Sequence, residues 1–208
     1  MGKIVLATII ISGSAKWLLK VGGNKEKWYG SDRIFMYVMT VFGAMTVNYS
    51  EQCTEYGWVV SNLRLLAGCL LAGGLLSAAY MDRRNCWVYN YVWWWCLPWA
   101  GILGLTAGGG FHGIVAVLVF VMLQQLLFSR MYGKADCHAF SVCALAECGN
   151  AVGMVGFLLQ MFLSVVLLTI VQLFRGNVTP RGRLREPQPF IPYIITAFFS
   201  VTFLESVF

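Results

Sequence analysis

Charge is scarce in this chain, and its scarcity indicates the class of protein. Only 12% of the 208 residues are charged and only nine are acidic, whereas 59% are hydrophobic and the mean hydropathy is +0.70. A soluble domain of this length cannot hide so much apolar surface, which excludes that class. An isolated strand would leave backbone groups unpaired in lipid, so the composition predicts an all-α, polytopic membrane protein.

The chain also lacks the patterns of a metal site or a disulfide framework. Its seven cysteines contain no Cys-x-x-Cys pair, and most lie in apolar runs, where a thiol behaves as a small hydrophobe. The net charge of +6 comes from short basic clusters scattered between apolar runs, not from one basic face. We therefore expect membrane lipids around the chain, no nucleic-acid partner, no metal and no cofactor.

Apolar segments of about the length of a membrane-spanning helix follow one another along the chain. Six of them cover residues 62–81, 87–107, 110–129, 135–150, 151–174 and 188–206. A further span is predicted at 33–49, and 3–20 is left open because Lys16 and Lys20 interrupt its apolar run. These segments divide the chain into an N-terminal extension, 1–61, and a six-helix region, 62–208.

Basic residues mark one side of these spans. Alternate loops contain Arg83–Arg84, Arg130 with Lys134, and the four arginines of 175–187, whereas the loop 106–113 between two of them has no charge. Basic loops remain in the cytoplasm as a rule, so the pattern predicts that these loops are cytoplasmic. Asp82 and Asp136 adjoin two of the basic clusters and are expected at that same membrane face.

Asp82 and Asp136 are the candidate catalytic residues. An ionised group at the edge of a membrane span is costly and usually remains there for function. Two carboxyl groups within hydrogen-bond reach share one proton, so one can activate a water as base while the other protonates the carbonyl oxygen and the leaving amine. That is the chemistry of aspartic peptide hydrolysis, and the sequence leaves open which aspartate is the base.

Three segments, in order, resemble the motifs of bacterial prepilin peptidases, which are GxGD-type aspartic membrane proteases. The stretch LLSAAYMDRRNCWVYNYVWW, which contains Asp82, resembles their first catalytic segment. YGKADCHAF, with its aspartate 54 positions on (82 to 136), resembles the GxGD motif. PQPFIPYIITAF resembles the closing helix, which typically opens with a Pro-Phe-x-Pro-like segment.

The motifs depart from the family at several positions. Ala135 stands where the family has glycine before the second aspartate, His138 where it has lysine, and Tyr89 where it has proline. Asn90 keeps the family residue. By the resemblance, Asn90, Gly133 and His138 are the candidate residues that support the motifs or contact the substrate.

The resemblance implies a fold and a function. The fold is a six-helix GxGD-type core in a short form without the methyltransferase region, preceded by one or two hydrophobic segments. The function is an intramembrane aspartic endopeptidase that removes the N-terminal leader of prepilin-like or pseudopilin substrates in type IV pilus assembly or protein secretion. It implies a place in the bacterial cell membrane, with the active site facing the cytoplasm.

Two other interpretations are weighed. His138 and Cys143 suit a Cys/His membrane peptidase that processes a quorum-sensing peptide, although a helix places them on different faces and Asp82 is then unexplained. In the second interpretation the chain is a catalytically inactive relative of the prepilin peptidases. His112, beside the glycine run 108–110, is expected to be structural or interfacial, and the tryptophans of 93–95 are expected to anchor the chain at the lipid interface.

Overall fold

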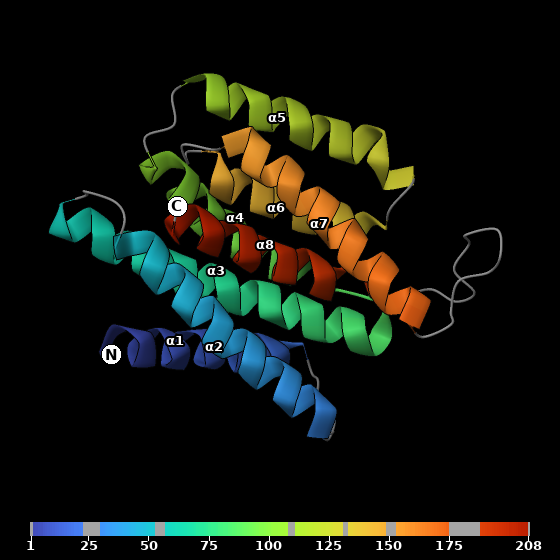
Figure 1. Cartoon of the computed structure of the whole chain (residues 1–208), viewed down its shortest axis with the longest axis horizontal. Helices are drawn as coiled ribbons and strands as arrows, with labels where there is room; N and C mark the ends of the chain where they lie inside the picture. Colours follow the sequence, from blue (N-terminus) through green and yellow to red (C-terminus); the bar gives the residue numbers. More distant parts are fainter. Residues whose placement is uncertain are drawn as a thin grey trace.

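The computed structural model describes residues 2–22, 30–52, 57–107, 111–130, 133–148, 153–174 and 188–207, and within these ranges every regular element is helical. The elements are α1 (Gly2–Val21), α2 (Gly30–Gln52), α3 (Trp58–Asn85), α4 (Asn90–Thr106), α5 (Phe111–Leu126), the 3₁₀ turn η1 (Phe128–Arg130), α6 (Lys134–Glu147), α7 (Gly153–Phe174) and α8 (Ile191–Val207) (Figure 1). The all-helical class is confirmed, and each predicted span corresponds to one helix. The glycine run 108–110, the segment 175–187 and the side chain of His112 lie outside the described residues.

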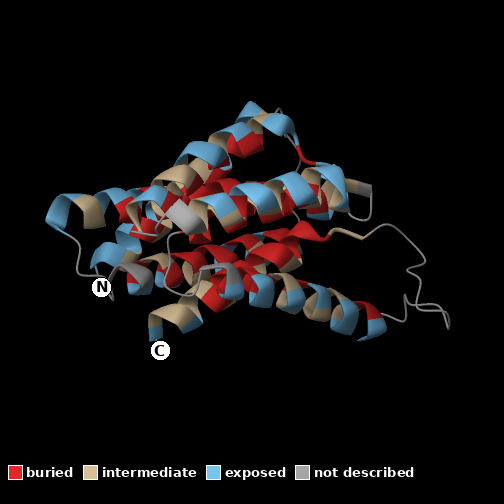
Figure 2. Ribbon diagram, turned by 90° about the horizontal axis from the view of Figure 1, so that it is seen from above, coloured by how far each residue is buried: buried red, intermediate tan, exposed pale blue. Residues whose placement is uncertain are grey.

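Three of the described helices are long and apolar enough to cross a membrane. They are Gly2–Val21, Trp58–Asn85 and the part of α7 from Val155 to Phe174; α8 and the part of α5 from Gly113 to Leu126 are shorter apolar helices. Exposed side chains on the outer faces of α5 and α7 are largely apolar, while the buried residues gather between the helices (Figure 2). These features indicate a helical membrane protein.

Helix α3 occupies the middle of the bundle and packs against α1, α2, α4 and α8 (Figure 1). Glycines on α3 allow these close approaches. A Cβ atom on Gly73 would lie 2.9 Å from the carbonyl oxygen of Ile11 on α1, and one on Gly68 would lie 2.9 Å from Val47 on α2. Small residues at such crossings let membrane helices approach closely.

Helix α6 packs against α4, so that its first turn lies at the end of the bundle where α3 finishes. Gly104 of α4 faces the backbone carbonyl of Leu145 on α6, and no side chain larger than hydrogen fits there. The α3–α4 and α4–α6 contacts therefore position the two segments that contain Asp82 and Asp136.

The tryptophans of 93–95 do not form one interfacial cluster, which corrects that expectation. Trp93 is buried against His138, with ring centroids 6.0 Å apart. Trp95 lies between Trp17 and Trp99, with ring centroids 5.2 and 5.8 Å away, and donates a hydrogen bond from Nε1 to the carbonyl of Leu70 at 3.3 Å. Trp94 alone of the three faces outward, because consecutive residues of a helix point about 100° apart.

Candidate active site

Asp82 lies in the last turn of α3 and reaches across to the beginning of α8. Its side chain is buried, and Oδ2 accepts a hydrogen bond from the backbone N–H of Ile191 at 3.0 Å; the N–H of Phe190 also bonds it. The first N–H groups of a helix have no partner within that helix, and Pro192 has none to offer. Asp82 therefore caps α8 from another helix, and its negative charge is favoured at a helix N-terminus.

Asp136 lies in the first turn of α6 and is half-buried. Its Oδ2 accepts the backbone N–H of Gly133 at 3.2 Å, which satisfies one of the free donors at the start of α6. A Cβ atom on Gly133 would lie 3.2 Å from that same oxygen, so glycine leaves the carboxylate room to fold back.

The two carboxyl groups lie at the same end of the bundle, close enough for the charge of Asp82 to act on Asp136. Cys86, which follows α3, is within electrostatic reach of both. Partial desolvation raises the pKa of the exposed Cys86 thiol, and the negative charges of Asp82 and Asp136 raise it further. Cys86 has a left-handed backbone, with φ of 51°. Its N–H donates a hydrogen bond to the carbonyl of Asp82 at 2.8 Å, and α3 ends there. The chain thus reverses immediately after the first carboxylate.

A third aspartate, which the sequence interpretation missed, lies beside this pair. Asp32, in the first turn of α2, is buried and pairs with Arg84 at 2.9 Å and with Arg83 at 3.7 Å. It neutralises the two guanidinium groups that follow Asp82 and ties the N-terminal helices to the site. The sequence contains one signal that could have identified Asp32: it is an acidic residue at the basic end of the predicted span 33–49, the end expected to be cytoplasmic.

The predicted supporting residues differ in what they contact. Gly133 bonds a carboxylate, as described above. His138 is turned toward α5 and α4, with Nδ1 3.3 Å from Nε2 of Gln125 and its ring beside Trp93. Asn90 is the exposed first residue of α4, and within the described ranges no hydrogen bond joins it to either aspartate.

The geometry gives no support to a Cys/His site. Cys143 is fully buried, with Gln160 as its polar neighbour. The imidazole of His138 faces Gln125 instead, and no hydrogen bond joins it to Cys143 among the described residues. Six described cysteines are free thiols, and five of these are buried, as expected of small hydrophobes; Cys86 is the exposed exception.

A separate polar cluster lies toward the other end of α3. Arg64 is buried and donates to the carbonyl of Leu103 and to the hydroxyl of Thr106, each at 3.0 Å. Glu147, also buried, accepts the hydroxyl of Thr202 at 2.8 Å. Both side chains line a cavity of about 50 Å³, which has room for one or two waters. The cluster links α3, α4, α6 and α8.

The described residues contain no group of three or more His, Cys, Asp or Glu side chains placed to hold a metal ion. No family model matches the chain, and neither curated proteins nor solved structures include a match to it.

Proposed function

We propose that this chain is an aspartic endopeptidase of the membrane, with Asp82 and Asp136 as its catalytic pair. The observation that carries the proposal is that carboxyl groups from α3 and α6, 54 positions apart in sequence, lie at one end of the bundle within electrostatic reach of each other. Two such groups cannot both ionise at low cost, so the pair holds one proton between them. One neutral and one ionised carboxyl are the requirement for aspartic hydrolysis.

The hydrogen bonds favour Asp82 as the base and Asp136 as the acid. Asp82 accepts two backbone N–H groups at the start of α8, and donors of this kind stabilise an ionised carboxylate. Asp136 accepts one exposed N–H and also experiences the charge of Asp82. The shared proton therefore resides on Asp136.

The reaction follows from this distribution of charge. Asp82 removes a proton from a water, whose oxygen attacks the scissile carbonyl, while Asp136 gives its proton to the carbonyl oxygen. In the tetrahedral intermediate the carbon–nitrogen bond then breaks, and the proton held by Asp82 passes to the leaving amine. The products are a carboxyl group and an amine, and the second hydroxyl proton of the intermediate returns to Asp136.

We propose prepilin-like or pseudopilin leaders as substrates, cut at the cytoplasmic face of the bacterial cell membrane by a six-helix GxGD-type core. Support comes from the way the three resembling segments meet: Asp82 in the first bonds Ile191 in the third and interacts with Asp136 in the second. The convergence of the three segments is what the resemblance requires of an active site.

The test is the amide substitution of each aspartate. Asn keeps the shape of Asp but cannot share the proton, so Asp82→Asn and Asp136→Asn should each lower cleavage by roughly 10²–10⁴-fold. The full chain is reconstituted in liposomes with synthetic substrates that carry a short basic leader ending in glycine before an apolar helix, and the products are identified by mass spectrometry. Glu205→Gln is the matched control, because it makes the same chemical change in a half-buried residue on α8 away from the pair.

Near-wild-type cleavage by either Asn variant would show that the pair is not catalytic. A similar loss in Glu205→Gln would show that the assay measures folding.

A further inference from the structure

A groove of about 460 Å³ separates α1 from α2 on the outside of the bundle. Six of the eight residues that line it have polar side chains, namely Thr8, Ser12 and Lys16 from α1 and Arg33, Tyr37 and Thr40 from α2, but most of the lining surface is apolar. Membrane helices usually present apolar side chains outward, so cations and hydroxyl groups in such a groove call for a ligand with both a polar and an apolar part.

The two cations of the groove have no carboxylate partner among the described residues. Lys16 and Arg33 are both exposed, and neither makes an ion pair with a carboxylate in the part of the chain that the structure describes. The neighbouring Asp32 is turned away toward Arg83 and Arg84. Lys16 and Arg33 therefore present two positive charges to whatever occupies the groove.

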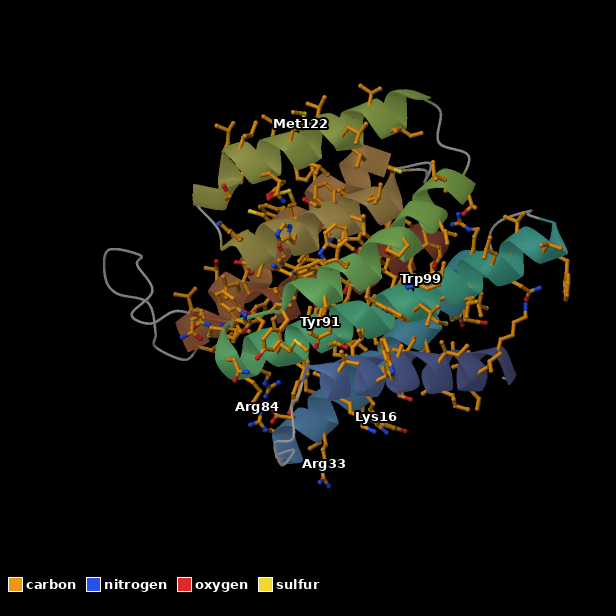
Figure 3. The ribbon with its side chains drawn as sticks, turned by 180° about the vertical axis from the view of Figure 1, so that it is seen from behind. Lys16, Arg33, Arg84, Tyr91, Trp99 and Met122 are labelled. Carbon is orange, nitrogen blue, oxygen red and sulfur yellow. The ribbon has the colours of Figure 1, made fainter. Side chains whose placement is uncertain are left out.

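Both cations lie at the end of the bundle that contains the aspartates. Lys16 follows Ala15, whose carbonyl accepts the hydroxyl of Ser77, roughly 7 Å along α3 from Asp82. Arg33 follows the aspartate that binds Arg84. Figure 3 shows Lys16 and Arg33 along the edge of the molecule that α1 and α2 form. This is the end that the basic clusters predict to be cytoplasmic, at the level of the lipid headgroups.

The surface around the groove is apolar. Ile9 on α1 and Ile34 and Val38 on α2 are all more than half exposed. From Lys16 the groove extends to Thr8, eight residues or about 12 Å deeper along α1. An occupant must therefore have an anionic end at Lys16 and Arg33 and a body that tolerates a hydrocarbon setting.

We propose that the groove between α1 and α2 binds an anionic phospholipid. Its phosphate lies between Lys16 and Arg33, its glycerol and ester oxygens face Tyr37 and Ser12, and its acyl chains continue along the apolar sides of the two helices. Basic pockets between membrane helices on the cytoplasmic side suit such headgroups. A soluble phosphate compound matches the two charges but not the apolar surroundings.

The test measures retention of dioleoyl phosphatidylglycerol by the full chain in mild detergent, by native mass spectrometry, with dioleoyl phosphatidylcholine as the neutral comparison. Each cation near an anionic headgroup is worth about fivefold in affinity. Lys16→Gln and Arg33→Gln should each weaken retention about fivefold, and the double variant about 30-fold, with phosphatidylcholine unaffected. The matched control is Lys3→Gln with Lys134→Gln, which removes the same net charge from exposed positions outside the groove and should leave retention within about twofold.

A second variant separates the groove from general electrostatic attraction. Ser12→Trp fills the groove and keeps both cations, so it should also lose phosphatidylglycerol. Glycerol 1-phosphate should not displace the lipid, because it has no acyl chain.

Equal retention by the wild type and the Lys16→Gln/Arg33→Gln variant would overturn the proposal. It would also fail if glycerol 1-phosphate displaced the lipid completely, since the ligand would then be a soluble phosphate. A dimer that Ser12→Trp abolishes, with lipid retention unchanged, would instead place a second copy of the chain in the groove.

Discussion

The hydrogen bond between Asp82 and α8 leads to a prediction that does not depend on catalysis. Replacing Asp82 with Ala removes the acceptor for the buried N–H of Ile191. A hydrogen bond to a charged group contributes about 1.5–3 kcal/mol, and a value of about 2 kcal/mol corresponds to roughly 30-fold faster exchange of that amide hydrogen. Asp82→Asn retains an oxygen that can accept the bond. In this variant the backbone amide of Ile191 should therefore exchange within about threefold of the wild-type rate.

Hydrogen–deuterium exchange in detergent micelles measures this effect locally. The segment 189–193 contains two prolines, so only the amides of Phe190, Ile191 and Tyr193 report from it. Asp136→Ala is the control, because its bond is to Gly133 at the start of α6 and its loss should leave these three amides unchanged. If the backbone amide of Ile191 exchanged at the wild-type rate in Asp82→Ala, the capping of α8 by Asp82 would be refuted.

Two further predictions concern packing and orientation. Gly104→Val should lower the free energy of unfolding by about 1–3 kcal/mol in a detergent titration, because its side chain would meet a backbone carbonyl of α6. Gly101→Val, on the same helix with open space around it, should change it by less than about 0.5 kcal/mol, and equal effects would contradict the close contact. In a cysteine-free background with cysteines returned singly, Cys86 and Lys134→Cys should be labelled from the same side of the membrane and Ala107→Cys from the other. Labelling of the first two from opposite sides would be incompatible with the proposed pair.

The helices were largely predictable because hydropathy alone locates long apolar segments. The prediction was least complete where charges enter a helix. Lys16 and Lys20 interrupt the apolar run of 3–20, yet α1 continues through both. The two lysines are four residues apart, so they share one exposed face of the helix while Ala15 and Leu19 are buried. Likewise α2 begins at Gly30, before the apolar run at 33–49, and the charged residue Asp32 lies in its first turn.

The candidate site was only partly predictable. Asp82 and Asp136 stand out in a chain with nine acids, and the third motif pointed to the segment around Ile191. The bond between Asp82 and Ile191 joins residues 109 positions apart, and the pairing of Asp32 with Arg84 also depends on how helices pack. Local pattern contains no information about such contacts, since the same sequence signals fit several arrangements of the helices.

The cap on α8 has a consequence for the way the protein is made. Synthesis proceeds from the N-terminus, so α3 and α6 enter the membrane before α8 exists. Until α8 arrives, the carboxylate of Asp82 lacks the two backbone donors that favour its ionised form. A chain released before α8 is made would contain both aspartates and still lack the charge distribution that the proposed reaction requires. In the proposed mechanism, the synthesis of α8 is thus the step that activates the site.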